Sequence, residues 1–399
     1  MRISTALLFT QGVKAIQEQQ ASVARTQQQV ASGKRILSPA DDPAGAKRLL
    51  DLDQTLSLTR QYSRNADTAT NRLAIEDSTL EGVTNLLQRV RELTIQGGNA
   101  TLDDGNRLAL AEEVSGRLDE LLGLANTRDG NNEYVFAGVS TQTRPFARAG
   151  GGGFSYNGDQ GVRELQVGPG YQIRVGDSGS AVFMEVPLGN GVYVAADDPG
   201  NTGDGRLNPG SVTDQGAWVA DDYTIDFLTP STWEVRDGGG ALVLSGNYAS
   251  GDPIAFNGIE IFIEGQPATG DRFTVSPSTA GNIFQTIEDL ATALRTPTVD
   301  GADTAHLTNA LTRALQDVDQ ALTTVDSVRS RVGSRLNAIE SEKNINAGFE
   351  VHLQEVHSQI QDLDFAEAIS RLTQQTTALE AAQASFVRIQ GLSLFNFLR

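Results

Sequence analysis

Large apolar side chains recur at helical spacing along residues 362–399. The steps between them are three, four and seven residues, which places these side chains on one narrow helical stripe: Phe365, Ile369, Leu372, Leu379, Phe386 and Ile389. A stripe this narrow is typical of a seam for a second helix. The tip of the chain adds Leu394, Phe395 and Leu398. An apolar chain end indicates that something docks on it, although a helix packed on its own domain is the alternative.

The first part of the chain carries a matching pattern. Ile16, Val23 and Val30 are spaced by seven residues, which is the heptad repeat of a coiled coil. We expect Gln20 and Gln27 at the intermediate seam positions, where polar side chains weaken a pairing but constrain its register. Residues 1–42 and 362–399 are therefore predicted to be coiled-coil segments.

These segments cannot be stable as lone helices. Ordering a backbone costs about 1–2 kcal/mol per residue, whereas a fully buried large apolar side chain returns about 1.5–3 kcal/mol. A handful of seam residues therefore cannot order a whole helix, even with its internal hydrogen bonds. We expect each end to be disordered alone and ordered against the other end or against neighbouring copies.

Two long helical patterns lie inside these ends and predict the two halves of a rod, residues 43–140 and 281–361. Asp42 is a suitable N-cap and Pro43 fits the first helical position. The first pattern runs to Gly97, with a possible interruption near residues 62–66, and a second helix is expected over 106–126. The later pattern covers 283–294 and resumes from about Thr304 towards residue 347.

The middle of the chain changes to period two, which predicts strands. The alternating or apolar runs are 133–139, 171–175, 223–227 and 259–264. Three Asn-Gly pairs, at 157–158, 190–191 and 257–258, are hairpin signals. The predicted fold class is α+β: a long antiparallel helical bundle or coiled-coil rod from both chain ends, with an all-β insertion domain at 141–280.

The charge distribution restricts the partners. The chain has a formal net charge of −19, whereas nucleic acids and anionic membranes attract clustered Lys and Arg. Residues 150–280 hold seventeen acidic residues and five arginines, a net charge of −12. We therefore expect neither nucleic acid nor membrane as a partner. With no run long enough for a membrane span or a signal-peptide core, we expect a soluble protein or one exported without a cleaved signal.

The sequence offers little for catalysis, cofactor binding or metal binding. There is no Cys, and the three histidines, His306, His352 and His357, lack metal-ligand spacing. Helix capping accounts for Asp41 and Asp42, and no G-x-S-x-G elbow or phosphate loop is present. We therefore expect no enzyme activity, no cofactor and no metal site.

Ordered motifs at both ends resemble the flagellin superfamily, and more closely its hook-associated members. The N-terminal motifs are MRIST at residues 1–5, ASGKRI at 31–36 with DDP at 41–43, and EYVFAG at 133–138. A strand–turn–strand at 259–275 is similar to one that recurs in hook-associated proteins. The C-terminal motifs are DLDFAEA at 362–368, ALEAAQA at 378–384 and LSLFNFL at 392–398. Residues 148–258 resemble no segment of the family, as expected of its variable insertion.

The resemblance implies a structural protein of the bacterial flagellum at the junction of hook and filament. Its expected partners are hook-associated protein 1, flagellin, its own copies in a helical tube, and a flagellar export chaperone on the C-terminal helix. It also implies secretion through the flagellar type III export apparatus to an extracellular position. A flagellin that builds the filament itself, or an adhesin or enzyme carried on a flagellin-like stem, are the alternatives.

Overall fold

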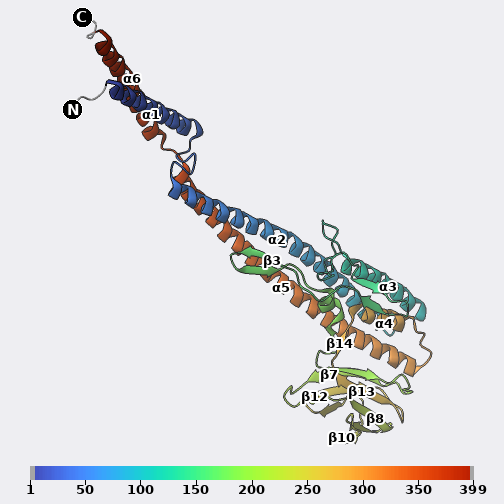
Figure 1. Ribbon diagram of the computed structural model, residues 1–399. Coiled ribbons are helices and arrows are strands. Elements are labelled where there is room, and N and C mark those ends of the chain that lie inside the picture. Colours follow the sequence, from blue (N-terminus) through green and yellow to red (C-terminus); the bar gives the residue numbers. More distant parts are fainter. Residues whose placement is uncertain (1–4, 396–399) are drawn as a thin grey trace. The chain divides into compact units, whose positions relative to one another are not determined.

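The computed structural model describes residues 5–395. Helices come from both ends of the chain and strands come from its middle (Figure 1), so the predicted α+β fold class is confirmed. The chain forms two compact units. We refer to Met1–Arg64 with Glu342–Arg399 as the terminal unit, and to Asn65–Ser341 as the central unit.

The helices follow the heptad and amphipathic patterns of the sequence, with ends set by capping residues. Pro43 opens the second helix, and Asp42 caps it by accepting a hydrogen bond from the Gly45 N–H at 2.8 Å, as predicted. The helix then continues without the interruption considered near residues 62–66. The α-helices of the described chain are α1 (Thr5–Ser32), α2 (Pro43–Gly97), α3 (Asp104–Ala125), α4 (Ile283–Arg295), α5 (Gly301–Gln361) and α6 (Phe365–Phe395).

Within the central unit, α2 and α5 run antiparallel and α3 packs on α4. Arg329 of α5 reaches Asp77 of α2 at 3.2 Å, and Asp319 of α5 reaches Arg91 of α2 at 2.7 Å. Later residues of α2 thus pair with earlier residues of α5, as antiparallel helices require. These exposed or half-exposed ion pairs fix orientation more than they add stability.

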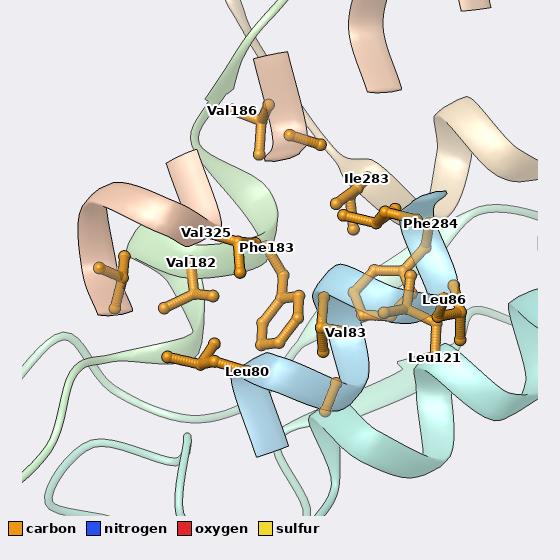
Figure 2. Packing of buried hydrophobic residues seen from close by; sticks show 14 of the residues in the cluster. Leu80, Val83, Leu86, Leu121, Val182, Phe183, Val186, Ile283, Phe284 and Val325 are labelled. Carbon is orange, nitrogen blue, oxygen red and sulfur yellow. The ribbon is translucent and has the colours of Figure 1, made fainter. Parts of the chain in front are cut away.

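One large hydrophobic core, which we call the helical core, holds these helices together. Leu80 of α2, Leu121 of α3 and Phe284 of α4 belong to it and are fully buried or nearly so. Figure 2 shows the Phe284 ring beside Phe183, which lies in a single π-helical turn, η1 (Ser180–Met184). The Phe183 and Phe284 ring centroids are 5.7 Å apart. The burial of this cluster is the main source of stability in the central unit.

The strand predicted at residues 133–139 is wrong. Only an isolated bridge, between Arg128 and Tyr134, forms there. Residues 134–137 are nevertheless buried. Their backbone groups can be buried because segments other than a strand satisfy them: the Val135 N–H donates to the Thr127 carbonyl, and the Phe136 carbonyl accepts from the Gly179 N–H. Gly138, at a φ of +69°, then turns the chain away. The run has the apolar composition of a strand, but it forms a buried loop.

Short strands in the first half of the predicted insertion belong to the helical core. Phe146, Phe154, Val167 and Ile173 from these strands are buried in it. The strands are β1 (Phe146–Arg148), β2 (Phe154–Tyr156), β3 (Glu164–Gly168), β4 (Tyr171–Arg174), β5 (Val186–Pro187) and, later in the chain, β14 (Ala280–Gly281). The predicted insertion at 141–280 therefore contains two structurally different parts.

The second part, residues 193–277, has a hydrophobic core of its own and is called the outer β domain here. A five-stranded sheet has the order β10-β9-β8-β13-β6, and a three-stranded sheet has the order β11-β12-β7. Phe227, Ile261 and Phe273 lie in their common core. The strands are β6 (Tyr193–Asp197), β7 (Arg206–Val212), β8 (Tyr223–Thr229), β9 (Thr232–Arg236), β10 (Leu242–Asn247), β11 (Pro253–Phe256), β12 (Ile259–Glu264) and β13 (Arg272–Pro277).

Only one of the three predicted Asn-Gly hairpins forms. Asn257 and Gly258 both have positive φ, at +44° and +78°, and join β11 to β12 so that Phe256 faces Ile259. This is the backbone requirement that selects Asn-Gly in two-residue hairpins. The pairs at 157–158 and 190–191 lie in connections whose flanking strands pair elsewhere, since β2 pairs with β1 and β6 with β13.

Polar side chains of α5 hold the outer β domain. Asn309 accepts from the Leu207 N–H at 2.7 Å and donates to the Gly205 carbonyl at 3.2 Å. The two ring nitrogens of His306 lie 2.5 Å from Asp197 Oδ2 and 3.2 Å from the Asn201 carbonyl oxygen. Because both neighbours are acceptors, this geometry favours the doubly protonated imidazolium.

The His306 contact predicts a pH-dependent stability. Burial alone would lower the pKa of His306. The hydrogen bonds from its ring to Asp197 and Asn201, together with the negative charges of Asp197 and Asp303, outweigh burial, so the pKa is raised. A raised pKa in the folded state means that the stabilisation is complete below the unfolded value of about 6.5 and is lost as the pH rises through the folded pKa. We expect His306→Gln to lower the melting temperature of the outer β domain at pH 5.5 and to have a smaller effect at pH 9. Equal effects at both pH values would show that the imidazole carries no charge-dependent contact.

Candidate assembly site at the paired chain ends

Helices α1 and α6 pack side by side within the terminal unit. They run antiparallel, because Phe9 near the start of α1 meets Phe386 in the last part of α6, with ring centroids 5.2 Å apart, and Thr26 meets Gln375 earlier in α6. Partly or fully buried positions form one stripe on each helix. They include Ile16, Gln19, Val23, Thr26 and Val30 on α1, and Ala368, Leu372, Gln375, Leu379, Ala382 and Phe386 on α6.

Both stripes alternate steps of three and four residues, which is coiled-coil geometry. Ile16, Val23 and Val30 lie on the α1 stripe, but Gln20 and Gln27, expected between them, are exposed. Gln19 and Thr26 take those positions. The heptad spacing of the apolar residues is compatible with either choice, and the partners on α6 decide between them.

Gln375 of α6 is the partner that decides. Its backbone carbonyl accepts from Gln19 Nε2 at 3.1 Å, and its side-chain oxygen accepts from the Thr26 hydroxyl at 2.8 Å. Its amide nitrogen donates to the Ser22 hydroxyl at 2.9 Å. A shift of α1 by one helical turn would break all three bonds, so this polar group fixes the register of the pair.

The apolar residues predicted for the assembly seam fall into three groups. Val23 is buried, and Ile16, Val30, Leu372, Leu379 and Phe386 are partly buried on the α1–α6 stripes. Phe365 and Ile369 are 50% and 53% exposed and lie off that stripe. The side chains of Ile389, Leu394, Phe395 and Leu398 lie outside the described residues. An assembly role for the whole set stays a prediction.

The terminal unit has little hydrophobic core. Among its described residues, the buried apolar side chains are Val23, Ile36, Leu49, Leu363 and Ala368. Large apolar side chains on its helices are instead exposed, including Leu50 at 69% and Val351 at 65%. The central unit buries many aromatic and aliphatic side chains completely, so the contrast lies in packing and not in the amount of helix.

The connection from α1 to α2 and the connection from α5 to α6 are joined by a short backbone bridge. Lys34 pairs with Asp362, the Arg35 N–H donates to the Gln361 carbonyl at 2.7 Å, and the Leu363 N–H donates to the Gly33 carbonyl at 2.9 Å. Gly33 has a φ of +69°, a conformation that favours glycine. The ASGKRI and DLDFAEA motifs therefore meet at this bridge.

A polar cavity of about 670 Å³ opens beside the bridge. Its charged groups pair with one another: Arg35 with Asp42 at 3.5 Å and Arg371 with Glu367 at 2.6 Å. Asp41 Oδ2 accepts backbone hydrogen bonds from Ser38 and Leu37, and the bond from Ser38 makes the largest contribution to lowering the Asp41 pKa. Asp41 and Asp42 thus act as backbone caps, and this arrangement is that of a structural joint.

Two negative findings apply to residues 5–395. No group of three or more His, Cys, Asp or Glu side chains is placed to hold a metal ion. None of the helices described combines the length and the hydropathy that crossing a membrane requires.

Three family models match separate parts of the chain. The bacterial flagellin N-terminal helical region matches residues 3–141, and the bacterial flagellin C-terminal helical region matches residues 315–398. The D2-like domain of flagellar hook-associated protein 1 matches residues 196–277. The expectation that residues 148–258 resemble nothing in the family is therefore wrong for the outer β domain.

Relatives match over nearly their whole length. Flagellar hook-associated protein 3 of Escherichia coli K12 is 26% identical over 397 residues, 99% of each chain. The crystal structure of Xanthomonas campestris FlgL is 31% identical and has a TM-score of 0.72, covering 77% of this chain and 99% of that one. The crystal structure of the flagellar junction protein FlgL from Legionella pneumophila is 32% identical and has a TM-score of 0.69, covering 74% and 99%.

These similarities agree with the order of the elements, since helical regions of the flagellin type flank an outer domain of the hook-associated type. Both FlgL structures are more than 30% identical and are covered almost completely by this chain. The chain belongs to the flagellar hook-associated protein 3 family, the structural proteins of the flagellar hook–filament junction.

Proposed function

We propose that this chain polymerises between hook-associated protein 1 and flagellin, and that its terminal helices carry the assembly. The observation that supports this most directly is the terminal unit, whose helices pair in register but bury few apolar side chains among the described residues. Such a unit is stabilised by mass action when neighbouring copies cover it. Order at the chain ends then follows from incorporation.

The exposed apolar side chains offer surfaces for those neighbours. They lie on more than one helix of the terminal unit: Leu50 and Leu58 on α2, Ile345, Phe349 and Val351 on α5, and Phe365 and Ile369 on α6. Contacts of this kind, repeated head to tail without closing, build a helical tube. We infer that α1 and α6 line the inner layer, that α2 and α5 pack laterally, and that the acidic outer β domain faces outward.

The low apolar burial of the terminal unit also suits export through the flagellar type III apparatus. A narrow channel requires an unfolded chain, and segments that bury little apolar surface cost little to unfold. A dedicated chaperone that covers the apolar face of α6 before export would prevent premature pairing with α1. Both the export route and the chaperone come from the family resemblance.

Charged substitutions on the α1–α6 stripe test the role of the terminal helices. Asp at Leu372 or Leu379 places a charge in the pairing interface, so we expect incorporation into flagella to be abolished. Both tryptophans, Trp218 and Trp233, lie in the outer β domain, so the tryptophan fluorescence of the purified variant should be unchanged.

Leu108→Asp is the matched control, because Leu108 is half-exposed on α3 in the central unit. It should assemble almost as well as the unmodified chain. Normal incorporation of Leu372→Asp and Leu379→Asp would contradict the proposal.

A filament-forming flagellin is the second candidate, and the two flagellin models that match the chain favour it. Abundance separates the two functions. We expect this chain to be a trace component of sheared flagella and to be located by antibody at the hook–filament boundary in electron micrographs. A chain that dominates the sheared protein would instead be a filament subunit.

Removal of the outer β domain tests the adhesin or enzyme alternative. Residues 193–277 can be deleted cleanly, because the Ser278 N–H donates to the Val192 carbonyl at 2.9 Å and the two cut ends adjoin. A wider deletion of 150–280 would remove Phe154 and Phe183 from the helical core. We expect the shortened chain to support filament growth. Failure of growth despite export of a folded product would assign an essential function to the outer β domain.

A further inference from the structure

Two charged side chains of α2 are buried in the central unit with one polar atom each left unpaired. Arg72 is 6% exposed and Glu76 is fully buried. The terminal nitrogens of Arg72 donate to Asp129 at 3.0 Å, to Glu133 at 3.2 Å and to the Tyr134 carbonyl at 3.3 Å. Arg72 Nε has no hydrogen-bond partner among the described residues. An unpaired donor at such depth is costly to the fold.

Glu76 also has one buried polar atom without a hydrogen-bond partner among the described residues. Its Oε1 accepts from the Asp177 N–H at 3.0 Å, whereas its Oε2 is buried and has no partner in the described part of the chain. Burial, and next the nearby Asp177 carboxylate, raise the pKa of Glu76 to about 8. Near neutral pH this shift favours the protonated carboxyl over the carboxylate.

Both unpaired atoms face the same space, above the Cα of Gly176. A Cβ built on Gly176 would lie 3.8 Å from Arg72 Nε, 3.8 Å from the Val135 carbonyl oxygen and 3.9 Å from Glu76 Oε2. No other side chain or backbone atom beyond the neighbours of Gly176 in the chain lies closer to that position. A small cavity of about 10 Å³ is lined by Arg72, Val135, Gly176 and Asp177 among others. Glu76 is not in this lining, and only its distance to the Gly176 position places it beside the cavity.

The donors and acceptors around this space define the ligand. Arg72 Nε can only donate, and the Val135 carbonyl can only accept. A cation is disfavoured by the guanidinium, and an anion by the carbonyl oxygen. The ligand must therefore both accept and donate hydrogen bonds, and a cavity of about one probe sphere admits a single water.

We propose that one buried water is bound at this position as a fixed part of the central unit. The water accepts from Arg72 Nε, donates to the Val135 carbonyl and forms its third hydrogen bond with Glu76 Oε2; three bonds are the usual number for an internal water. It joins α2 to the irregular segment at residues 129–135, and it lies beside the segment at residues 175–178, which contains Gly176. Arg335 of α5 holds the second segment from the other side through its ion pair with Asp177.

The site also accounts for the glycine at position 176. The φ of Gly176 lies outside the positive region, so its backbone conformation does not require glycine. A methyl group would meet its neighbours at ordinary van der Waals distances, so no clash forbids alanine. What a methyl group would do is occupy the space that the water needs.

Gly176→Ala is therefore a discriminating variant. If the cavity is dry, alanine fills it and restricts the unfolded chain, so stability should rise. If a water is bound, alanine displaces it and leaves Arg72 Nε and Glu76 Oε2 unpaired, and we expect the melting temperature of the full chain to fall by about 2 °C or more. Gly151→Ala is the matched control, since Gly151 is a loop glycine with open space around it; this change should leave the melting temperature the same or higher. A higher melting temperature in Gly176→Ala would overturn the proposal.

A crystal structure of the unmodified chain, at a resolution that shows ordered waters, tests the site directly. We expect one density peak at about 2.6–3.2 Å from Arg72 Nε, Glu76 Oε2 and the Val135 oxygen. The same peak should be missing in crystals of Gly176→Ala. An empty cavity in the unmodified chain, or a side chain turned to fill it, would contradict the assignment even if the alanine variant proved unstable for other reasons.

Discussion

The terminal unit buries few apolar side chains among its described residues, and this low burial distinguishes it from the central unit. Two helices of about thirty residues cannot repay their backbone entropy through one narrow seam. The central unit has no such deficit, because α2 to α5 enclose aromatic side chains such as Phe183 and Phe284 in a common core. The central unit thus has a complete core of its own, and under the proposed function neighbouring copies would complete the terminal unit.

Polar side chains fix the register of the α1–α6 pair, but they add little to its stability. Gln375 binds Gln19, Ser22 and Thr26 across α1 and α6, so a misaligned pair would bury unsatisfied amide and hydroxyl groups. A weak but register-specific interface suits the proposed export, in which the chain crosses a channel unfolded and pairs only at its destination. The backbone bridge between Lys34 and Asp362 joins the α1–α2 connection to the α5–α6 connection.

Local signals in the sequence were sufficient for the helices, for the cap at Asp42, for the Asn257-Gly258 hairpin and for the heptad of Ile16, Val23 and Val30. They were insufficient where tertiary contacts choose between equivalent local patterns. Gln20 and Gln19 fit the heptad equally, and only Gln375 separates them. The apolar run at 133–139 has strand composition, but no neighbouring strand lies beside it. Likewise, period two cannot reveal that β1 to β5 pack on helices whereas β6 to β13 enclose a core of their own.

Amide hydrogen exchange, measured on the free monomer and on assembled flagella, shows directly whether the terminal helices become ordered only on assembly. In the monomer, the amides of α1 and α6 should exchange far faster than those of α3 and α4, because few buried side chains hold the terminal helices closed. In the assembled structure, protection of α1 and α6 should rise to that of the central unit. Equal protection of all four helices in the free monomer would contradict the account.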